Sequence, residues 1–231
     1  MEDIIIELKL ILRLKAVPYK RFEKIVGKLR HAAFGLPAGM GLCTPFNATI
    51  SLHPKFVALG KQGFVRSAFN DWRRLLITMK SRPTHVNELV VQTIADVGNM
   101  DASGIGAGWV WMSTTGAYPH PVWRVEWPNT VSSEVVSDTN PNGLVTNSDL
   151  EMAALLLAWL VLEQIATTHH RSALARSDNT PTCAWVTRMS PKSKIGARLV
   201  RALALRQRVM CASPMITLHI AGKANNIADI A

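Results

Sequence analysis

The chain has 231 residues, of which 48% are hydrophobic and 18% charged. This composition excludes an intrinsically disordered protein and allows one large domain or two small ones. There are 26 Lys and Arg against 16 Asp and Glu, so the net charge is +10 at pH 7. A basic excess favours a polyanionic partner, most simply nucleic acid, although an ordinary solvated surface would give the same balance.

Cysteines and apolar runs narrow the class of protein further. Cys43, Cys183 and Cys211 are far apart and odd in number, so they indicate neither a zinc site nor a disulfide framework. The apolar N-terminus carries charges and lacks a signal-peptide cleavage site. The longest uncharged apolar run, residues 152–162, is too short to span a bilayer. We expect an intracellular protein, cytoplasmic or nuclear, or a fragment of one, with no membrane partner.

The first 92 residues are predicted to be a small helical segment. Apolar positions at helical spacing follow Pro18 and stop at Gly35, and a second helix is expected over 66–81, ending before Pro83. No repeat and no low-complexity tract is present.

Residues 93–231 are predicted to form an α/β domain. Alternating patterns predict three strands, then an apolar helix, a strand, two helices and a last strand. This order indicates a five-stranded mixed sheet flanked by helices. The expected strands are 95–103, 106–113 and 122–128, then a short strand that ends at ALARSDN (173–179), and a last strand at 215–221. The expected helices are the apolar helix 149–165 and two later helices at 180–189 and 195–211.

Four acids follow successive elements of this predicted domain: Asp101, Glu151, Asp178 and Asp229. In a mixed sheet whose first, fourth and fifth strands are neighbours, these element ends can converge. Converging carboxylates repel one another unless a cation joins them, and hard oxygen ligands suit Mg²⁺ or Mn²⁺. Two such ions about 3.5–4 Å apart form a clamp for in-line displacement at phosphorus.

Each acid also has a purely structural interpretation. Asp101 could shape the glycine turn that follows it, and Glu151 could complete a capping box with Ser148. Asp178 could cap the helix after it. Asp229 could simply be solvated, two residues from the last one. The functional interpretation therefore depends on the joint placement of the four.

Four stretches carry these acids: MDASGIGAGWVW (100–111), NSDLEMAALLL (147–157), SDNTPTCAWVTRMSPKS (177–193) and HIAGKANNIAD (219–229). Together they resemble the ribonuclease H-like domain of a retrotransposon reverse transcriptase. Residues 22–39 and 72–90 resemble the thumb or connection segment that precedes this domain in gypsy-like and tyrosine-recombinase elements.

The resemblance implies that Asp101, Glu151, Asp178 and Asp229 hold two Mg²⁺ ions. It also implies a location in the cell or in a retroelement particle, next to the polymerase portion of a parent reverse transcriptase. His219 stands near the place of a mobile histidine that helps product release in related nucleases, although a strand histidine is the simpler interpretation. Met100 replaces the usual Thr, and the family's last helix should continue beyond residue 231, so the C-terminal helix is expected to be truncated.

A basic stripe is predicted on the helix from 195, led in by Lys194. Lys194, Arg198, Arg201 and Arg208 share one side of it, where they could follow phosphates, or could form a solvated surface. Arg206 falls within the adjacent apolar face of Ile195, Leu199, Ala202 and Val209. Gly104, Gly106 and Asn179 are further candidates for close contacts with nucleic acid.

The function expected from these observations is metal-dependent hydrolysis of the RNA strand of an RNA–DNA hybrid. Another nuclease or an integrase on the same fold is a second possibility, although integrases usually use three acids. A third is a non-catalytic nucleic-acid-binding remnant or connection module of a decayed retroelement.

Overall fold

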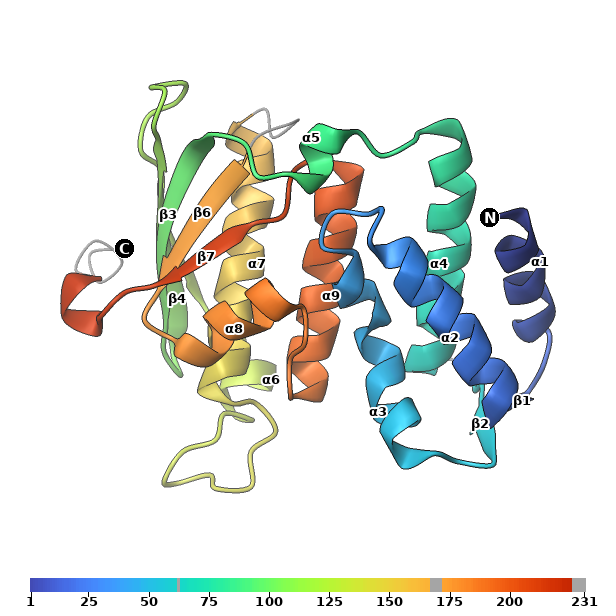
Figure 1. Ribbon diagram of the computed structural model, residues 1–231. Helices are drawn as coiled ribbons and strands as arrows, with labels where there is room; N and C mark the ends of the chain where they lie inside the picture. Colours follow the sequence, from blue (N-terminus) through green and yellow to red (C-terminus); the bar gives the residue numbers. More distant parts are fainter. Residues whose placement is uncertain (62, 167–171, 226–231) are drawn as a thin grey trace.

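The structure, a computed structural model, describes residues 1–61, 63–166 and 172–225. A β-sheet occupies one side and a group of helices the other, with the chain beginning on the helical side (Figure 1). Two long helices lie between the sheet and the N-terminal helices. The predicted order of a helical segment followed by a sheet-containing part is therefore seen in space as well as in sequence.

The N-terminal segment is helical, as predicted. Its two longest helices, α2 and α4, match the two ranges read from the sequence. A two-stranded antiparallel pair of three-residue strands, β1 with β2, was not predicted, because strands this short show no alternation. The elements are α1 (Glu2–Ile11), β1 (Ala16–Pro18), α2 (Tyr19–Ala33), η1 (Gly39–Cys43), α3 (Thr44–Leu52), β2 (Phe56–Ala58), α4 (Phe64–Ser81) and α5 (Val86–Leu89).

The second part contains the five-stranded sheet, in the order β5-β4-β3-β6-β7. The pairs β5–β4 and β4–β3 are antiparallel, and β3–β6 and β6–β7 are parallel. The predicted fold class, an α/β fold with a five-stranded mixed sheet flanked by helices, is confirmed. The elements are β3 (Ile94–Ala102), β4 (Gly106–Ser113), β5 (Val122–Glu126), α6 (Asn129–Ser132), α7 (Asn147–Ile165), β6 (Ser172–Ser177), α8 (Thr180–Arg188), α9 (Lys194–Val209), β7 (Ile216–His219) and η2 (Gly222–Ala224).

Two hydrophobic clusters hold together the part of the chain that the structure describes. One lies among α1, α2 and α4 and includes Phe22, Phe69 and Trp72. The other lies between the sheet and α7 and includes Trp111 and Trp159. Because β3 carries buried residues on the side facing α7, the strand end that follows is fixed against that helix.

Helix α9 packs on both clusters. Its Val200 and Leu203 belong to the sheet cluster, and Ala204 belongs to the N-terminal cluster. Helix α9 contacts α7 on one side and η1 and α3 on the other, and Figure 1 shows it between the two parts. A helix buried on two sides has no single polar face, which matters for the basic stripe predicted on it.

Candidate metal centre and nucleic-acid interface

Three of the four predicted acids converge. Asp101 is the penultimate residue of β3, Glu151 lies near the start of α7, and Asp178 follows β6 directly. One ligand oxygen from each lies within 4.8 Å of the others. The convergence has a topological cause. Strands β3 and β6 are parallel neighbours, so their carboxyl ends lie at the same end of the sheet, and the start of α7 reaches that end, where Glu151 accepts from the Ala102 amide.

Glu151 is the buried member of this group, with 1% of its surface exposed. Its Oε1 accepts a hydrogen bond from the Ala102 amide, and its Oε2 accepts one from the Ser177 hydroxyl, both at 3.3 Å. Burial, and after it the negative charge of Asp101, raise the pKa of its carboxyl to about 8. A carboxylate in this position is costly unless positive charge is brought to it.

The structural interpretations of Glu151 and Asp178 are wrong. The capping box of α7 is formed by Thr146 and Asp149, whose side chains bond each other's backbone amides, so Glu151 plays no part in it. The N-cap of α8 is Asn179, whose side chain accepts from the Thr182 amide. Neither Glu151 nor Asp178 therefore caps these helices, and both carboxylates lie in the cluster with Asp101.

The other predicted catalytic residues divide into two cases. Asp229 lies outside the described residues. His219 ends β7 as an exposed side chain, and its Nε2 lies 3.0 Å from the carbonyl oxygen of Asp178. The strand position inferred from the sequence is thus correct, and the imidazole lies beside the backbone of one metal-ligand candidate.

Two residues with a role at this edge were not singled out from the sequence. Ser177 links two parts of the site, because its hydroxyl donates to Glu151 and accepts from the Asn179 amide. Asn225 is buried, and its Nδ2 donates to the carbonyl oxygen of Met100, immediately before Asp101. Both occur inside the stretches that carry the acids, which was the available signal.

The cluster suits a hard divalent cation. Asp101, Glu151 and Asp178 offer only oxygen atoms, and three carboxylates this close repel one another when ionised. Asp101 and Asp178 are more exposed than Glu151, so an ion could reach them from solvent while keeping water ligands. These three residues would hold the metal.

The predicted basic stripe on α9 is only half present. Lys194 and Arg198 are exposed, as expected. Arg201 is half-buried and pairs with Asp71 of α4. Arg208 is 2% exposed and pairs with the fully buried Glu88. The prediction failed for Arg208 because α9 packs on two sides.

The helical face predicted from the sequence was also wrong. Val209, placed on the apolar side, is 63% exposed, whereas Gln207 and Arg208 are buried. Arg206, the misfit, bonds Glu163 of α7 through its guanidinium. Arg206 and Glu163 are more than forty positions apart in the sequence. The residue pattern of α9 alone therefore gives no sign of this ion pair.

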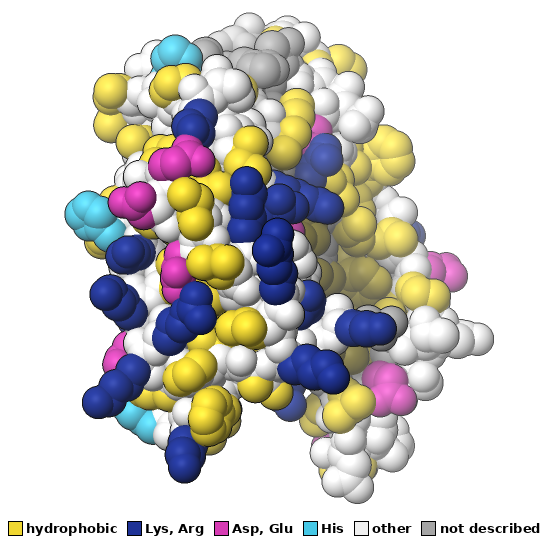
Figure 2. Space-filling view, turned by 90° about the vertical axis from the view of Figure 1, so that its right-hand side faces the viewer, with side chains coloured by type: hydrophobic (Ala, Val, Ile, Leu, Met, Phe, Trp, Pro, Cys, Tyr) yellow, Lys and Arg dark blue, Asp and Glu magenta, His cyan; other side chains and the backbone are white. Residues whose placement is uncertain are grey.

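Most of the net positive charge of the chain lies in the N-terminal helical segment and not on α9. Residues 1–92 carry 15 Lys and Arg against 6 Asp and Glu, whereas residues 93–231 carry 11 against 10, so nine of the ten net charges belong to the first part. Figure 2 looks onto the side of that first part and shows Lys and Arg widely spread over it with fewer acids. The exposed side chains on α2 that recur every three or four residues are Lys20, Lys24, Lys28 and His31, here called the α2 stripe.

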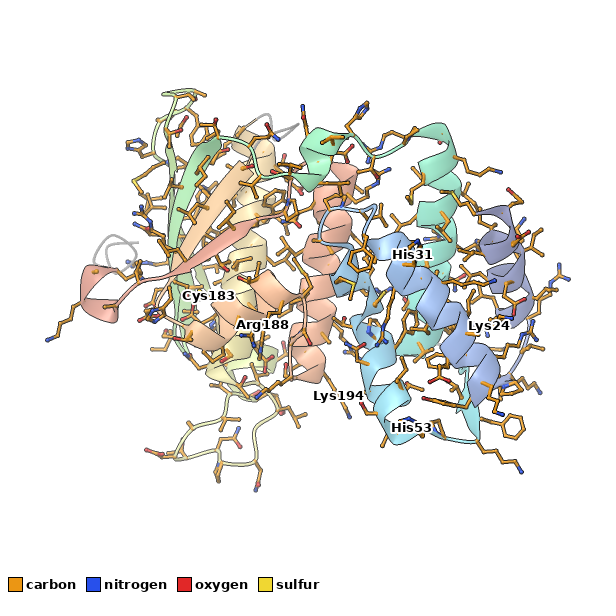
Figure 3. The ribbon with its side chains drawn as sticks, viewed as in Figure 1. Lys24, His31, His53, Cys183, Arg188 and Lys194 are labelled. Atoms are coloured by element: carbon orange, nitrogen blue, oxygen red, sulfur yellow. The ribbon has the colours of Figure 1, made fainter. Side chains whose placement is uncertain are left out.

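Figure 3 places Lys24 and His31 of the α2 stripe on their helix, Arg188 on α8 and Lys194 at the start of α9. Exposed cations are therefore present on both parts of the chain. A surface of this kind attracts a phosphate backbone without reading its sequence.

The three candidates for close backbone contact differ in surroundings. Gly104 is exposed in the turn between β3 and β4. A side chain at Gly106 would come within 2.4 Å of the Val125 carbonyl oxygen, so β-sheet pairing already explains this glycine. Asn179 is half-buried and uses its amide oxygen as the α8 cap.

The comparisons with known proteins give fold likenesses only. No protein-family model matches the chain, and no curated protein matches its sequence. Among solved structures, a ribonuclease H1 from Halobacterium salinarum is 17% identical over 58% of this chain and 90% of its own, with a TM-score of 0.38. An N-terminal ribonuclease H domain from Mycobacterium tuberculosis is 13% identical over 58% of this chain and 93% of its own, with a TM-score of 0.43.

A foamy viral protease–reverse transcriptase in complex with an RNA/DNA hybrid is 12% identical and covers 94% of this chain, which spans 27% of that protein, with a TM-score of 0.36. The strand order and the three carboxylates are features of this chain that stand independently of these likenesses. In the described parts of the chain, no helix has the length and apolarity needed to span a membrane.

Proposed function

We propose that this chain is a divalent-metal-dependent endonuclease that hydrolyses the RNA strand of RNA–DNA hybrids, as part of a retroelement reverse transcriptase. The observation that carries the proposal is the cluster of Asp101, Glu151 and Asp178, with ligand oxygens within 4.8 Å of one another at one edge of the sheet. Mg²⁺ is the expected ion, with Mn²⁺ able to replace it, and Asp229 would complete the ligand set for two ions.

In this proposal the metal supplies Lewis-acid assistance to phosphodiester hydrolysis, by activating water and stabilising the leaving oxygen. The protein's own groups would hold the carboxylates in place and orient them toward the metal. Ser177 and the Ala102 amide fix the Glu151 carboxyl by two hydrogen bonds. Asn225 fixes the backbone before Asp101. His219, beside Asp178, would assist product release.

The basic surface supports a nucleic-acid substrate. Because nine of the ten net charges lie in residues 1–92, the helical segment would bind the duplex while residues 93–231 carry the chemistry. The two hydrophobic clusters support this division near residue 92. Lys194 and Arg198 would add contacts from α9. The polymerase portion of the parent protein would be the second partner.

The test is incubation with hybrid, duplex DNA and duplex RNA, each labelled on one strand, with Mg²⁺ or with EDTA. The proposal predicts cuts in the RNA strand of the hybrid alone, abolished by EDTA and by Asp178→Asn. Tight hybrid binding without any cut would instead indicate the non-catalytic binding module. Cuts in duplex DNA would indicate another nuclease on the same fold.

A further inference from the structure

A cleft of about 400 Å³ opens beside the metal-site candidate, on the sheet and not among the helices. Asp101 lies at one side of it. The remaining lining comes from the β3–β4 turn and from strands β4 and β5. Its charged or hydroxyl-bearing side chains are Asp101, Ser103, Arg124 and Glu126, and its glycines are Gly106 and Gly108.

Strand register explains how the cleft arises. Asp101 of β3 pairs with Gly108 of β4, and Gly108 pairs with Arg124 of β5. Directly paired residues of antiparallel strands share one face of a sheet, so an acid and an arginine flank a position that has no side chain. The missing side chain leaves open space between the two charged groups.

The position of Arg124 suits a ligand that lies beside the metal-site candidate. Neighbouring strands lie about 4.8 Å apart, so the backbone at Arg124 is roughly 10 Å from that at Asp101. A guanidinium on its flexible stem can cross most of this distance. Arg124 is exposed and lines the cleft beside the glycine.

We propose that this cleft binds one backbone phosphodiester of the nucleic acid, with Arg124 as the residue that holds it. The guanidinium offers a planar fork of N–H donors that matches two phosphate oxygens. The phosphate bound here would lie a short way along the strand from the one at the carboxylates. The identity of the nucleic acid as a hybrid rests on the proposed function, whereas the phosphate site itself does not.

Glu126 limits where the phosphate can lie. It pairs with Gly106, two rows away from the Asp101–Gly108–Arg124 row and on the same face, and it lines the same cleft. The carboxylates of Glu126 and Asp101 both repel a phosphate, which is therefore confined to the Arg124 side of the cleft. Glu126 also supplies a matched control, because it is an exposed charge of opposite sign two residues away on the same strand.

The experiment measures hybrid affinity in EDTA, where no cleavage occurs, over salt from about 50 to 200 mM. Arg124→Ala should weaken binding roughly tenfold or more, the scale of a charged hydrogen bond, and should reduce the log–log salt slope by about 1. Arg124→Lys should restore the slope but not the full affinity, because a lysine keeps the charge without the fork. Glu126→Gln should bind as well as the wild type or more tightly.

The outcomes separate this inference from the proposed function. An Arg124→Ala protein that folds, and that keeps the wild-type affinity and slope, overturns the phosphate site whether or not the wild type cleaves. A wild type that fails to cleave, with Arg124→Ala still binding more weakly, overturns the nuclease and leaves the phosphate site standing. With active wild type, Arg124→Ala should raise KM with little change in kcat, as loss of uniform binding does; a fall in kcat alone would overturn the assignment.

Discussion

Replacing Glu151 by Gln in the metal-free protein should make it more stable. Glutamine has almost the same shape, and its amide can accept from the Ala102 amide and donate to the Ser177 hydroxyl, so the two contacts of Glu151 survive. What disappears is an ionisable carboxyl that is 1% exposed and lies beside Asp101 and Asp178. The change therefore isolates the cost of charge at this position.

The magnitude follows from the pKa of Glu151, which burial and the charge of Asp101 raise from 4.5 to about 8. The unfolded chain releases this proton near pH 4.5, whereas the folded protein keeps it until about pH 8. Stability is therefore fully present below the lower value and is lost as the pH rises to the upper one. At 1.36 kcal/mol per pKa unit, the loss reaches up to about 5 kcal/mol.

Glu151→Gln has no such proton to lose, so its advantage over the wild type should be small near pH 4.5 and grow to several kcal/mol near pH 8. Urea unfolding in EDTA, followed by the fluorescence of the seven tryptophans, measures it at several pH values. Mg²⁺ should then stabilise the wild type far more than Glu151→Gln, because an ion that binds only the folded state raises its stability.

Asp149→Asn is the matched control. Asp149 is equally buried, two residues earlier on α7, but its oxygens accept from Thr146, Ser193 and the Gly196 amide. Its replacement should lower stability and leave the response to Mg²⁺ intact. If Glu151→Gln behaves in the same way as Asp149→Asn, the Glu151 carboxylate is a structural group and the reasoning is refuted.

Three further outcomes are expected. Glu88→Ala should lower the free energy of unfolding by about 3–5 kcal/mol, because it leaves the buried Arg208 without its carboxylate; a loss under about 1 kcal/mol in urea unfolding would contradict this. The double replacement of Lys24 and Lys28 by Gln should reduce the salt slope of hybrid binding by about 2, and an unchanged slope would place the nucleic acid elsewhere. Arg201→Ala should leave that slope unchanged while lowering the melting temperature, because its guanidinium is paired with Asp71.

The sequence predicted the sheet and its order of elements closely. The five strands, the apolar helix and the two later helices lie within a few residues of the predicted ranges. Each of them carries a periodic apolar pattern within its own residues, which can be read without knowing the rest of the fold. The convergence of Asp101, Glu151 and Asp178 was also predictable, since parallel strand ends share one edge.

What the sequence did not contain were contacts between distant parts of the chain. The burial of Arg208 depends on Glu88, 120 positions earlier, and the placement of Arg206 depends on Glu163. The wrong capping assignment at Glu151 has a different cause. The sequence allowed two overlapping capping boxes at the start of α7, Ser148 with Glu151 and Thr146 with Asp149. The second forms, and Asp149 also accepts from the Gly196 amide at the start of α9, a contact that the sequence does not show.

The most direct test of the central claim is the binding of Mn²⁺ to the wild type and to Asp178→Asn, measured by the electron paramagnetic resonance of free Mn²⁺. Asp178 is partly exposed and caps no helix, so its replacement by Asn should leave the fold intact. A saturable site in the wild type that Mg²⁺ displaces and that Asp178→Asn weakens at least tenfold, about 1.4 kcal/mol, is the predicted result. Equal binding by both proteins, or no saturable binding by either, would contradict a metal centre at these three carboxylates.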